Sequence, residues 1–571
     1  MLPPLKKKKL SEKGEELFPK DFRTGYLTKE QASELFAFFN SNISQQLFGF
    51  EISKISVDSI WDSCPILVCA ICAIASIHHP LLSSKSKQLQ IYLHELCEKI
   101  IFKGRPKNEI DGYNTIVALI LCSFWLSNSQ MFTGLALQLA KEYGLNNPYS
   151  KNKDNLKLWY LLYILDGQQS LTFNRQPLLN ASEYTFKHSR EILCLMDNEN
   201  KLGDKENTLH ENKPKKLLKE TEEEPAQSQE LFTQSTSFTD LRLVSQVEYN
   251  QAINEAFRGN AWDLLMPSSF GIPSRSNLEL DKWMVSWTVL LAPGNHGAVW
   301  SSKSTLIYYN FAKMSINSTA VRRLNVNPTE DDTMFPKWTD ISDNKDSNYT
   351  PNQDSKAIQK IKEKTSKAND SSSEDEFSSE EEDEFISNSE LIVQDETVVS
   401  ANIAVNAAST VLNLVISDND IVENLKYVPV HIHIMIYYAA LLLLNPPIKS
   451  YDKSKHFDAR DHYQKVLTNL RLIKSLQKKI YANLPIDTKF GDKLVRRLDD
   501  IVTEKLTTIK SELAEMEDSK LRNEILMTFD LFTQNENTAI EIIDSSGNSS
   551  RGSTPGPEKI SAWPGSHHGH P

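Results

Sequence analysis

The residue types most able to do chemistry in this sequence are a pair of cysteines, an acid followed by an arginine, and two histidines. Cys69 and Cys72 form a CxxC, the spacing of half a zinc site or of a redox pair. A thiolate zinc site needs a second pair of ligands in a polar surrounding, whereas this pair lies inside an unbroken apolar run. We therefore expect both cysteines to pack in a core, and we expect no metal and no other cofactor.

Asp166 and Arg175 could act as a catalytic acid and its charge partner. Nothing near them supplies a nucleophile, a base or a phosphate-binding loop, and an ion pair that fixes the loop after a helix explains both residues. The sequence also lacks the short motifs of P-loop nucleotidases, zinc metalloproteases and serine hydrolases. We expect no catalytic residue, although an enzyme without a short motif stays open as an alternative.

The histidines fall into two groups. His431 and His433 are two positions apart, so a helix directs them to different faces rather than to one metal ion. His567, His568 and His570 lie in a tail rich in small and polar residues, where they could chelate adventitious metal or be a remnant of expression. Solvated side chains without a function are the simpler interpretation of the tail.

The elements that must position these residues are helices. Of the 571 residues, only 19 are glycine and 24 proline, while 40% are hydrophobic, so long stretches run without a helix breaker. The net charge of −12 opposes contact with a phosphate backbone. The longest apolar runs fall short of the ~20 residues that cross a bilayer, so we expect a soluble chain and no membrane partner.

Periodicity and capping signals predict where the helices lie. Thr28 and Gln31 have the spacing of a capping box, and Gly144 suits a left-handed C-cap. The further predicted helices cover residues 61–77, 89–102, 113–125, 131–143, 157–171, 241–257, 280–291, 301–323, 402–416, 429–444, 460–482 and 490–513. Short loops between neighbours predict an all-α, multi-helix domain of stacked antiparallel helix pairs, with long disordered insertions.

Composition divides the chain into helical and disordered segments. The helical body covers residues 17–196, 239–324 and 401–535, and two insertions interrupt it. Residues 197–238 are charged and residues 325–400 are acidic, and neither buries enough apolar surface to offset the entropy of ordering. A basic disordered arm, residues 1–16, and a disordered tail, residues 536–571, complete the chain.

Four apolar motifs follow one another along the first part of this body. Residues 63–75 read SP-x-L-x-x-A-I-C-A-x-A in outline, and residues 115–125 and 134–145 carry two further helical motifs. Residues 158–179 approximate LWW-x-L-Y-x-L-D…G-R-P-x-L-I and hold Trp159, Asp166, Arg175 and Pro177. The series resembles the fungal-specific transcription factor domain, the middle homology region of fungal zinc-cluster factors, over residues 28–325 and 400–445.

Two departures from the family pattern affect what this resemblance implies. Asn174 stands where the motif usually has glycine, and Gln176 separates Arg175 from Pro177, so we expect a different local turn. Family members usually carry a six-cysteine zinc cluster ahead of this domain, whereas no cysteine here precedes Cys64. We therefore expect indirect contact with DNA, unless the sequence is an incomplete form of a longer one.

The resemblance implies a nuclear regulator of transcription that is not an enzyme. Its expected partners are the transcription machinery or a DNA-binding partner protein. In the family such domains sometimes sense a small molecule, so an effector stays open here, as does a dimer. The rival hypothesis is a non-enzymatic helical scaffold subunit of a chromatin or centromere assembly.

Two segments outside the helical body carry candidate recognition residues. The basic arm reads as a nuclear import signal, with a solvated arm as the alternative, through Lys6, Lys7, Lys8 and Lys9. Phe377 and Phe385 are interleaved with carboxylates, as in an activation segment, and a solvating spacer explains them equally well. An acid three residues later makes candidate phosphorylation sites of Ser371, Ser372, Ser373, Ser378 and Ser379.

Overall fold

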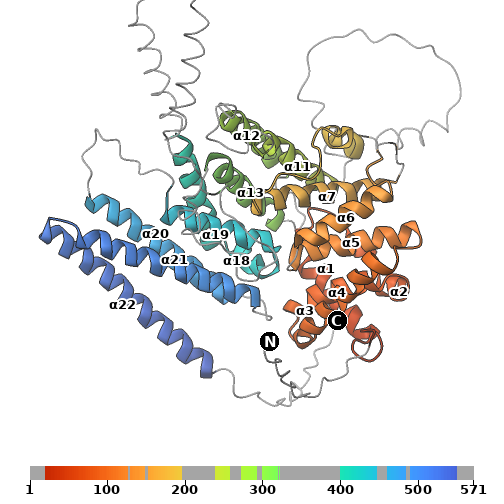
Figure 1. Ribbon diagram of the computed structural model, residues 1–571, viewed down its shortest axis with the longest axis horizontal. Helices are drawn as coiled ribbons and strands as arrows, with labels where there is room; N and C mark the ends of the chain where they lie inside the picture. The colour runs from red at the N-terminus through yellow and green to blue at the C-terminus, as the bar shows by residue number, and fades with distance from the viewer. Residues whose placement is uncertain are drawn as a thin grey trace, which may run out of the picture. The chain divides into compact units, whose positions relative to one another are not determined.

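The computed structural model describes residues 20–126, 129–147, 149, 152–195, 238–257, 272–291, 299–318, 321, 399–446, 459–483 and 489–549 (Figure 1). Every regular element in these ranges is a helix, so the predicted all-α class is confirmed. The chain forms two compact units, residues 1–455 with 469–502 and residues 456–468 with 503–571. The basic arm and nearly all of both predicted insertions lie outside the described residues.

The first unit begins with a helix that is capped as its sequence predicts. Helix α1, Lys29–Asn42, starts after Thr28, whose hydroxyl accepts a hydrogen bond from the Gln31 N–H at 3.2 Å. The Thr28 N–H in turn donates to Gln31 Oε1 at 3.2 Å, which completes the capping box. The buried face of α1 includes Leu35 and Phe39 and packs against α3.

Helix α3, Pro65–His78, is buried on nearly all sides between α1, α4 (Ser86–Lys103) and α5 (Glu109–Trp125). The sequence predicts one helix from residue 61, whereas the structure has a short helix α2, Val57–Ile60, and a new start at Pro65. Proline suits the first turn because it has no N–H to leave unpaired, and Cys64 before it has a non-helical backbone.

Helix α7 runs through the middle of the first unit. It spans Lys153–Thr172 and contacts α5, α6 (Ser129–Glu142), α11 (Phe238–Ile253) and α19 (Val430–Leu444). The connection from α6 passes through Gly144, whose φ of 66° is the left-handed conformation that the sequence predicts. Asn152 caps α7 by accepting hydrogen bonds from the Asp154 and Asn155 N–H groups.

The next part of the first unit follows α7 through short elements to three longer helices. Helix α8 spans Tyr184–Lys187, η4 is a π-helical turn at Glu191–Leu195, and η5, Asn254–Phe257, follows α11. Helix α12, Ile272–Leu290, packs on α11, and α13, Val299–Asn317, packs on α12. Trp283 Nε1 donates to Ser245 O at 2.7 Å and Tyr249 Oη donates to Tyr308 O at 2.9 Å, which ties the three helices together.

Helix α19 returns the chain to the body formed by the N-terminal helices. It follows α18, Asn419–Asn424, and a 3-10 turn η8, Leu425–Tyr427. Tyr438 Oη donates to Thr172 O at 3.1 Å, and Trp125 Nε1 donates to Tyr427 O at 2.9 Å. Residues on both sides of the predicted acidic insertion therefore belong to one unit.

One helix in the described part of the chain, Val399–Ser417, is long and apolar enough to cross a membrane by length and composition. The sequence predicts no such segment, because asparagines break its apolar run. Ala404, Ala408, Val411 and Val415 are buried at helical spacing, and Asn402 is exposed. This one-sided burial is also typical of a helix that packs on a protein core.

Helices α20, Ala459–Ala482, and α21, Lys489–Ala514, contribute residues to both units. In the second unit they are joined by α22, Ser519–Ser549. Arg460 forms a 2.7 Å ion pair with Glu524 there, and the ring of Tyr463 meets Phe529 edge-on. Helix α22 continues beyond residue 536, where the sequence predicts the disordered tail to begin, because apolar residues still recur at helical spacing up to Ile543.

Candidate functional site: the polar network around Asp166

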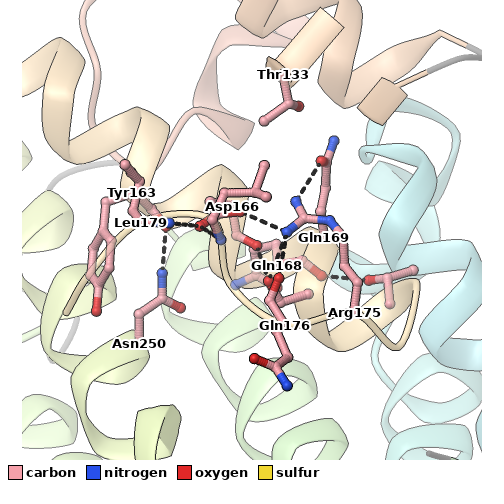
Figure 2. A network of polar contacts seen from close by, with 12 residues as sticks. Thr133, Tyr163, Asp166, Gln168, Gln169, Arg175, Gln176, Leu179 and Asn250 are labelled. Atoms are coloured by element: carbon pink, nitrogen blue, oxygen red, sulfur yellow. Dashed lines mark hydrogen bonds and ion pairs between the residues drawn. The ribbon is translucent and has the colours of Figure 1, made fainter. Parts of the chain in front are cut away.

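The four residues singled out by the family motif lie on α7 and on the loop that follows it. Figure 2 shows two of them, Asp166 and Arg175, with their polar contacts. Trp159 and Asp166 are on the helix, and Arg175 and Pro177 are on the loop, which runs back along the helix. Helix α7 ends at Thr172. The loop brings Arg175 back to the helical residue Asp166, and these contacts define what we name the Asp166 network: Asp166, Gln169, Ser170, Arg175, Leu178 and Leu179.

Asp166 uses both carboxylate oxygens inside the protein. Oδ1 accepts a hydrogen bond from Arg175 Nη1 at 2.8 Å, which is the ion pair that the sequence predicts. Oδ2 accepts from the main-chain N–H groups of Leu178 and Leu179, both at 2.8 Å. The Asp166 residue is 0% exposed, and a buried carboxylate is stable only when charge and hydrogen bonds offset its lost hydration.

The Arg175 guanidinium joins the helix end to the loop. Its Nη1 also lies within hydrogen-bond distance of Ser170 Oγ, at 3.2 Å, and of the Gln176 carbonyl, at 3.1 Å. Its Nη2 donates to Gln169 Oε1 at 3.1 Å. The planar fork of arginine makes these several bonds at once, so the side chain fixes the loop in one conformation.

Asn174 occupies the position at which the family motif usually has glycine. Its φ is 49°, in the left-handed region that glycine adopts freely and that asparagine tolerates best among the other residues. The Asn174 side chain also donates to Val321 O at 2.8 Å. Asn174 therefore adopts a backbone conformation that the glycine of the motif could also adopt.

The network is covered by a close contact between α7 and α11. Asn250 Nδ2 donates to Tyr163 O at 2.8 Å, and a Cβ atom at Gly167 would lie 2.3 Å from the same Nδ2 atom. The Lys157–Asp240 ion pair, at 2.6 Å, joins the same two helices. Sequence reasoning missed Asn250, although a glycine inside the apolar helix α7 is a signal of close approach.

A small cavity beside the network is too small for an organic ligand. Its volume is about 20 Å³, room for about one water molecule. It is lined by residues that include Tyr163, Asp166, Gly167, Pro177 and Asn250. A small-molecule effector therefore has no room at this place.

The arrangement holds the fold together rather than presenting reactive groups. Asp166 has no exposed surface, and Ser170 Oγ donates to the Asp166 carbonyl at 2.6 Å while contacting Arg175. A nucleophile needs an adjacent base and access to a substrate, and neither condition is met around Asp166 in the described residues. The Asp166 network thus acts as a structural clamp on the loop after α7.

Trp159 lies nearer the start of α7 than Asp166 does, and its side chain is fully buried. Its ring stacks on Phe186 with centroids 5.7 Å apart. The ring of Tyr163 also stacks on Phe186, with ring centroids 3.9 Å apart. The aromatic cluster fixes α8 against α7, since stacked rings add to the free energy of burial.

The remaining candidates named from the sequence lie elsewhere. Cys69 and Cys72 are fully buried in α3, and burial raises the pKa of both thiols. His431 and His433 are buried in α19, where burial lowers their pKa values to about 3 and about 4, and Tyr308 Oη lies 3.2 Å from His431 Nε2. No cluster of three potential metal ligands occurs among the described residues.

Several candidate residues lie outside the described part of the chain. They are Lys6, Lys7, Lys8, Lys9, Ser371, Ser372, Ser373, Phe377, Ser378, Ser379, Phe385, His567, His568 and His570.

Residues 60–241 match the model of the fungal specific transcription factor domain. The match contains the whole Asp166 network and confirms the resemblance seen in the motifs. The transcriptional activator of proteases prtT of Emericella nidulans is 23% identical over 450 residues, which cover 75% of this chain and 52% of that protein. The chain thus spans about half the length of the curated relative it matches. No solved structure matches the chain.

Proposed function

We propose that this chain is a fungal transcription regulator that acts in the nucleus through contacts with other proteins and not through catalysis. The relative in Emericella nidulans is named as a transcriptional activator, and the family of residues 60–241 is a family of transcription factors. The observation that carries the proposal is the Asp166 network. The polar residues of the family motif all turn inward and hold the fold, so they leave binding to the surface.

The proposal assigns the reading of DNA to a partner protein or to sequence beyond this chain. No cysteine precedes Cys64 in this sequence, whereas the family resemblance implies a six-cysteine zinc cluster ahead of the domain in other members. The net charge of −12 also opposes a phosphate backbone. Nuclear import through the lysines of the basic arm and activation through Phe377 and Phe385 belong to the same proposal.

A reporter assay tests the proposal on the full chain. We expect the chain, fused to a heterologous DNA-binding domain, to raise transcription of a reporter that carries the matching DNA site. Phe377→Ala with Phe385→Ala should lower that activity severalfold, because the two rings supply apolar contact to a coactivator.

Tyr349→Ala is the matched control, an aromatic residue of the predicted acidic insertion outside the acidic run of residues 374–384. It should leave the reporter activity unchanged. A tethered chain that reaches the nucleus and changes the reporter in neither direction would refute the proposal and favour the helical scaffold.

A further inference from the structure

A cleft of about 230 Å³ lies where the first turns of α5 and α7 meet the C-terminal end of α6. Its aromatic and aliphatic walls come from Ile110, Tyr113, Tyr143 and Leu145. Its polar lining comes from Glu109, Asn152, Asp154 and Asn155. This cleft shares no lining residue with the cavity beside the Asp166 network, and it has room for a small organic molecule.

One wall of the cleft is fixed in place by packing. The ring of Tyr143 lies over Gly112 of α5, where an added Cβ atom would come within 2.5 Å of the ring. Tyr143 Oη donates to the Pro106 carbonyl at 2.9 Å. The ring is thus fixed by its contact with Gly112 and by the hydrogen bond of its hydroxyl, and the cleft needs no rearrangement of this wall to accept a ligand.

Two carboxylates and one phenol of the cleft are available for a ligand, whereas Asn152 already caps α7. Glu109 and Asp154 are exposed and form no ion pair with any described residue. Two nearby cations form their ion pairs elsewhere, Arg105 with Glu142 and Lys54 with Glu51, although the charge of Asp154 also helps to raise the pKa of Lys54. Tyr113 makes no side-chain hydrogen bond within the described residues, and burial together with the charge of Asp154 raises the pKa of its phenol.

We propose that this cleft binds a small aliphatic amine in its protonated form. Two carboxylates attract an ammonium group and repel an anion. The phenol of Tyr113 stays neutral, so its oxygen accepts a hydrogen bond from the ammonium, and the aromatic faces add cation–π attraction. Ile110 and Leu145 offer apolar contact to the alkyl part of such a ligand.

The first turn of a helix favours an acid by itself, which accounts for Glu109 and Asp154 taken singly. This preference does not explain why Glu109 and Asp154, on two different helices, line the same aromatic cleft.

Calorimetric titration of the full chain with butane-1,4-diamine tests this proposal. We expect saturable binding that weakens with salt, whereas butane-1,4-diol, which has the same length without charge, should not bind. Glu109→Gln with Asp154→Asn should weaken diamine binding at least about tenfold, because both charges are lost while the shape is kept. Glu98→Gln, at an exposed acid of α4 that forms no ion pair with a described residue, is the control and should bind as the unchanged chain does.

Gly112→Ala provides an independent second variant. Its methyl group must displace the Tyr143 ring, so we expect weaker diamine binding with both carboxylates still present. If this variant fails to fold, the substitutions at the exposed Glu109 and Asp154 still decide the question.

Three results would overturn the proposal: no saturable binding of the diamine, equal binding by the Glu109→Gln, Asp154→Asn chain, or equal binding of the diol. A lysine derivative blocked at both main-chain ends distinguishes the sources of the amine. Tighter binding of the free diamine supports a small-molecule ligand, and tighter binding of the blocked lysine would instead indicate a partner's side chain. Because binding alone is measured, failure here leaves the proposed function standing.

Discussion

Asp166 combines a negative charge with complete burial, and each of its oxygens is matched by donors from a different part of the loop after α7. Arg175 neutralises the charge from one side, and two main-chain N–H groups bind the other oxygen. Such a buried pair is costly to break, because the partner that remains keeps its charge without its counter-ion. We therefore expect the residue to contribute to the stability of the fold.

Replacing the charge without changing the shape measures this contribution. We expect Asp166→Asn to lower the free energy of unfolding by about 3 kcal/mol, because Arg175 loses its counter-ion and the amide nitrogen cannot accept from the loop N–H groups. Urea unfolding, followed by near-UV circular dichroism, measures the change.

Asp58→Asn is the matched control. Asp58 pairs with Lys29 at 2.6 Å, but its side chain is 85% exposed, so its loss should cost less than about 1 kcal/mol. Equal effects of the two substitutions would show that the Asp166 network does not stabilise the fold.

The buried histidines of α19 predict a pH dependence. Burial lowers the pKa of His431 to about 3 and of His433 to about 4, from the usual 6.5, so the folded chain keeps both rings neutral. In the unfolded chain they take up protons below about pH 6.5, so stability should fall from that pH down to about pH 3, where the folded chain also binds the protons. The stability that they contribute is fully present above pH 6.5.

Urea unfolding at several pH values checks this expectation. A chain with His431→Gln and His433→Gln should lose less stability between pH 6.5 and pH 4 than the unchanged chain does. Identical slopes for the two chains would contradict the assigned cause.

At the scale of elements, the close approach of α7 and α11 is the feature that positions the loop and its network. Gly167 has no room for a side chain, because a Cβ atom would lie 2.3 Å from Asn250. The neighbouring helix α6 carries Gly134, around which nothing lies within 4 Å of an added Cβ. The two helical glycines thus have opposite surroundings.

Alanine at these two positions separates helix propensity from packing. Alanine favours a helix by about 1 kcal/mol over glycine, so Gly134→Ala should raise the melting temperature. We expect Gly167→Ala to lower it, because displacing Asn250 breaks the bond to Tyr163 O and outweighs the propensity gain. Calorimetric melting measures both, and a stabilised Gly167→Ala chain would contradict the close packing.

The sequence predicts most of these elements but few of the contacts between them. Thr28 with Gln31 and Gly144 mark helix ends by local geometry alone, and the structure agrees at both places. The Asp166–Arg175 pair could be predicted because both residues belong to the family motif and carry opposite charges. Asn250 could not, since its role depends on a helix far along the chain that brings it to Gly167.

At the scale of the whole chain, the part that matches the family model lies within a larger helical unit. The family match ends at residue 241, yet α19 hydrogen-bonds to α7 through Tyr438 and Thr172. The predicted acidic insertion therefore leaves from and returns to one folded unit. Under the proposed function this arrangement carries the acidic segment, with Phe377 and Phe385, on a stable helical body.

The most direct test of the account is the response of transcription to the loss of this protein. Rapid induced degradation of the tagged chain in its fungal cell, followed by measurement of nascent transcripts within minutes, separates direct effects from later ones. If this chain regulates transcription, a defined set of transcripts should change at once. Cells in which the Asp166→Asn chain has unfolded or been degraded should show changes in the same set. Unchanged transcripts after complete depletion would contradict the proposed function.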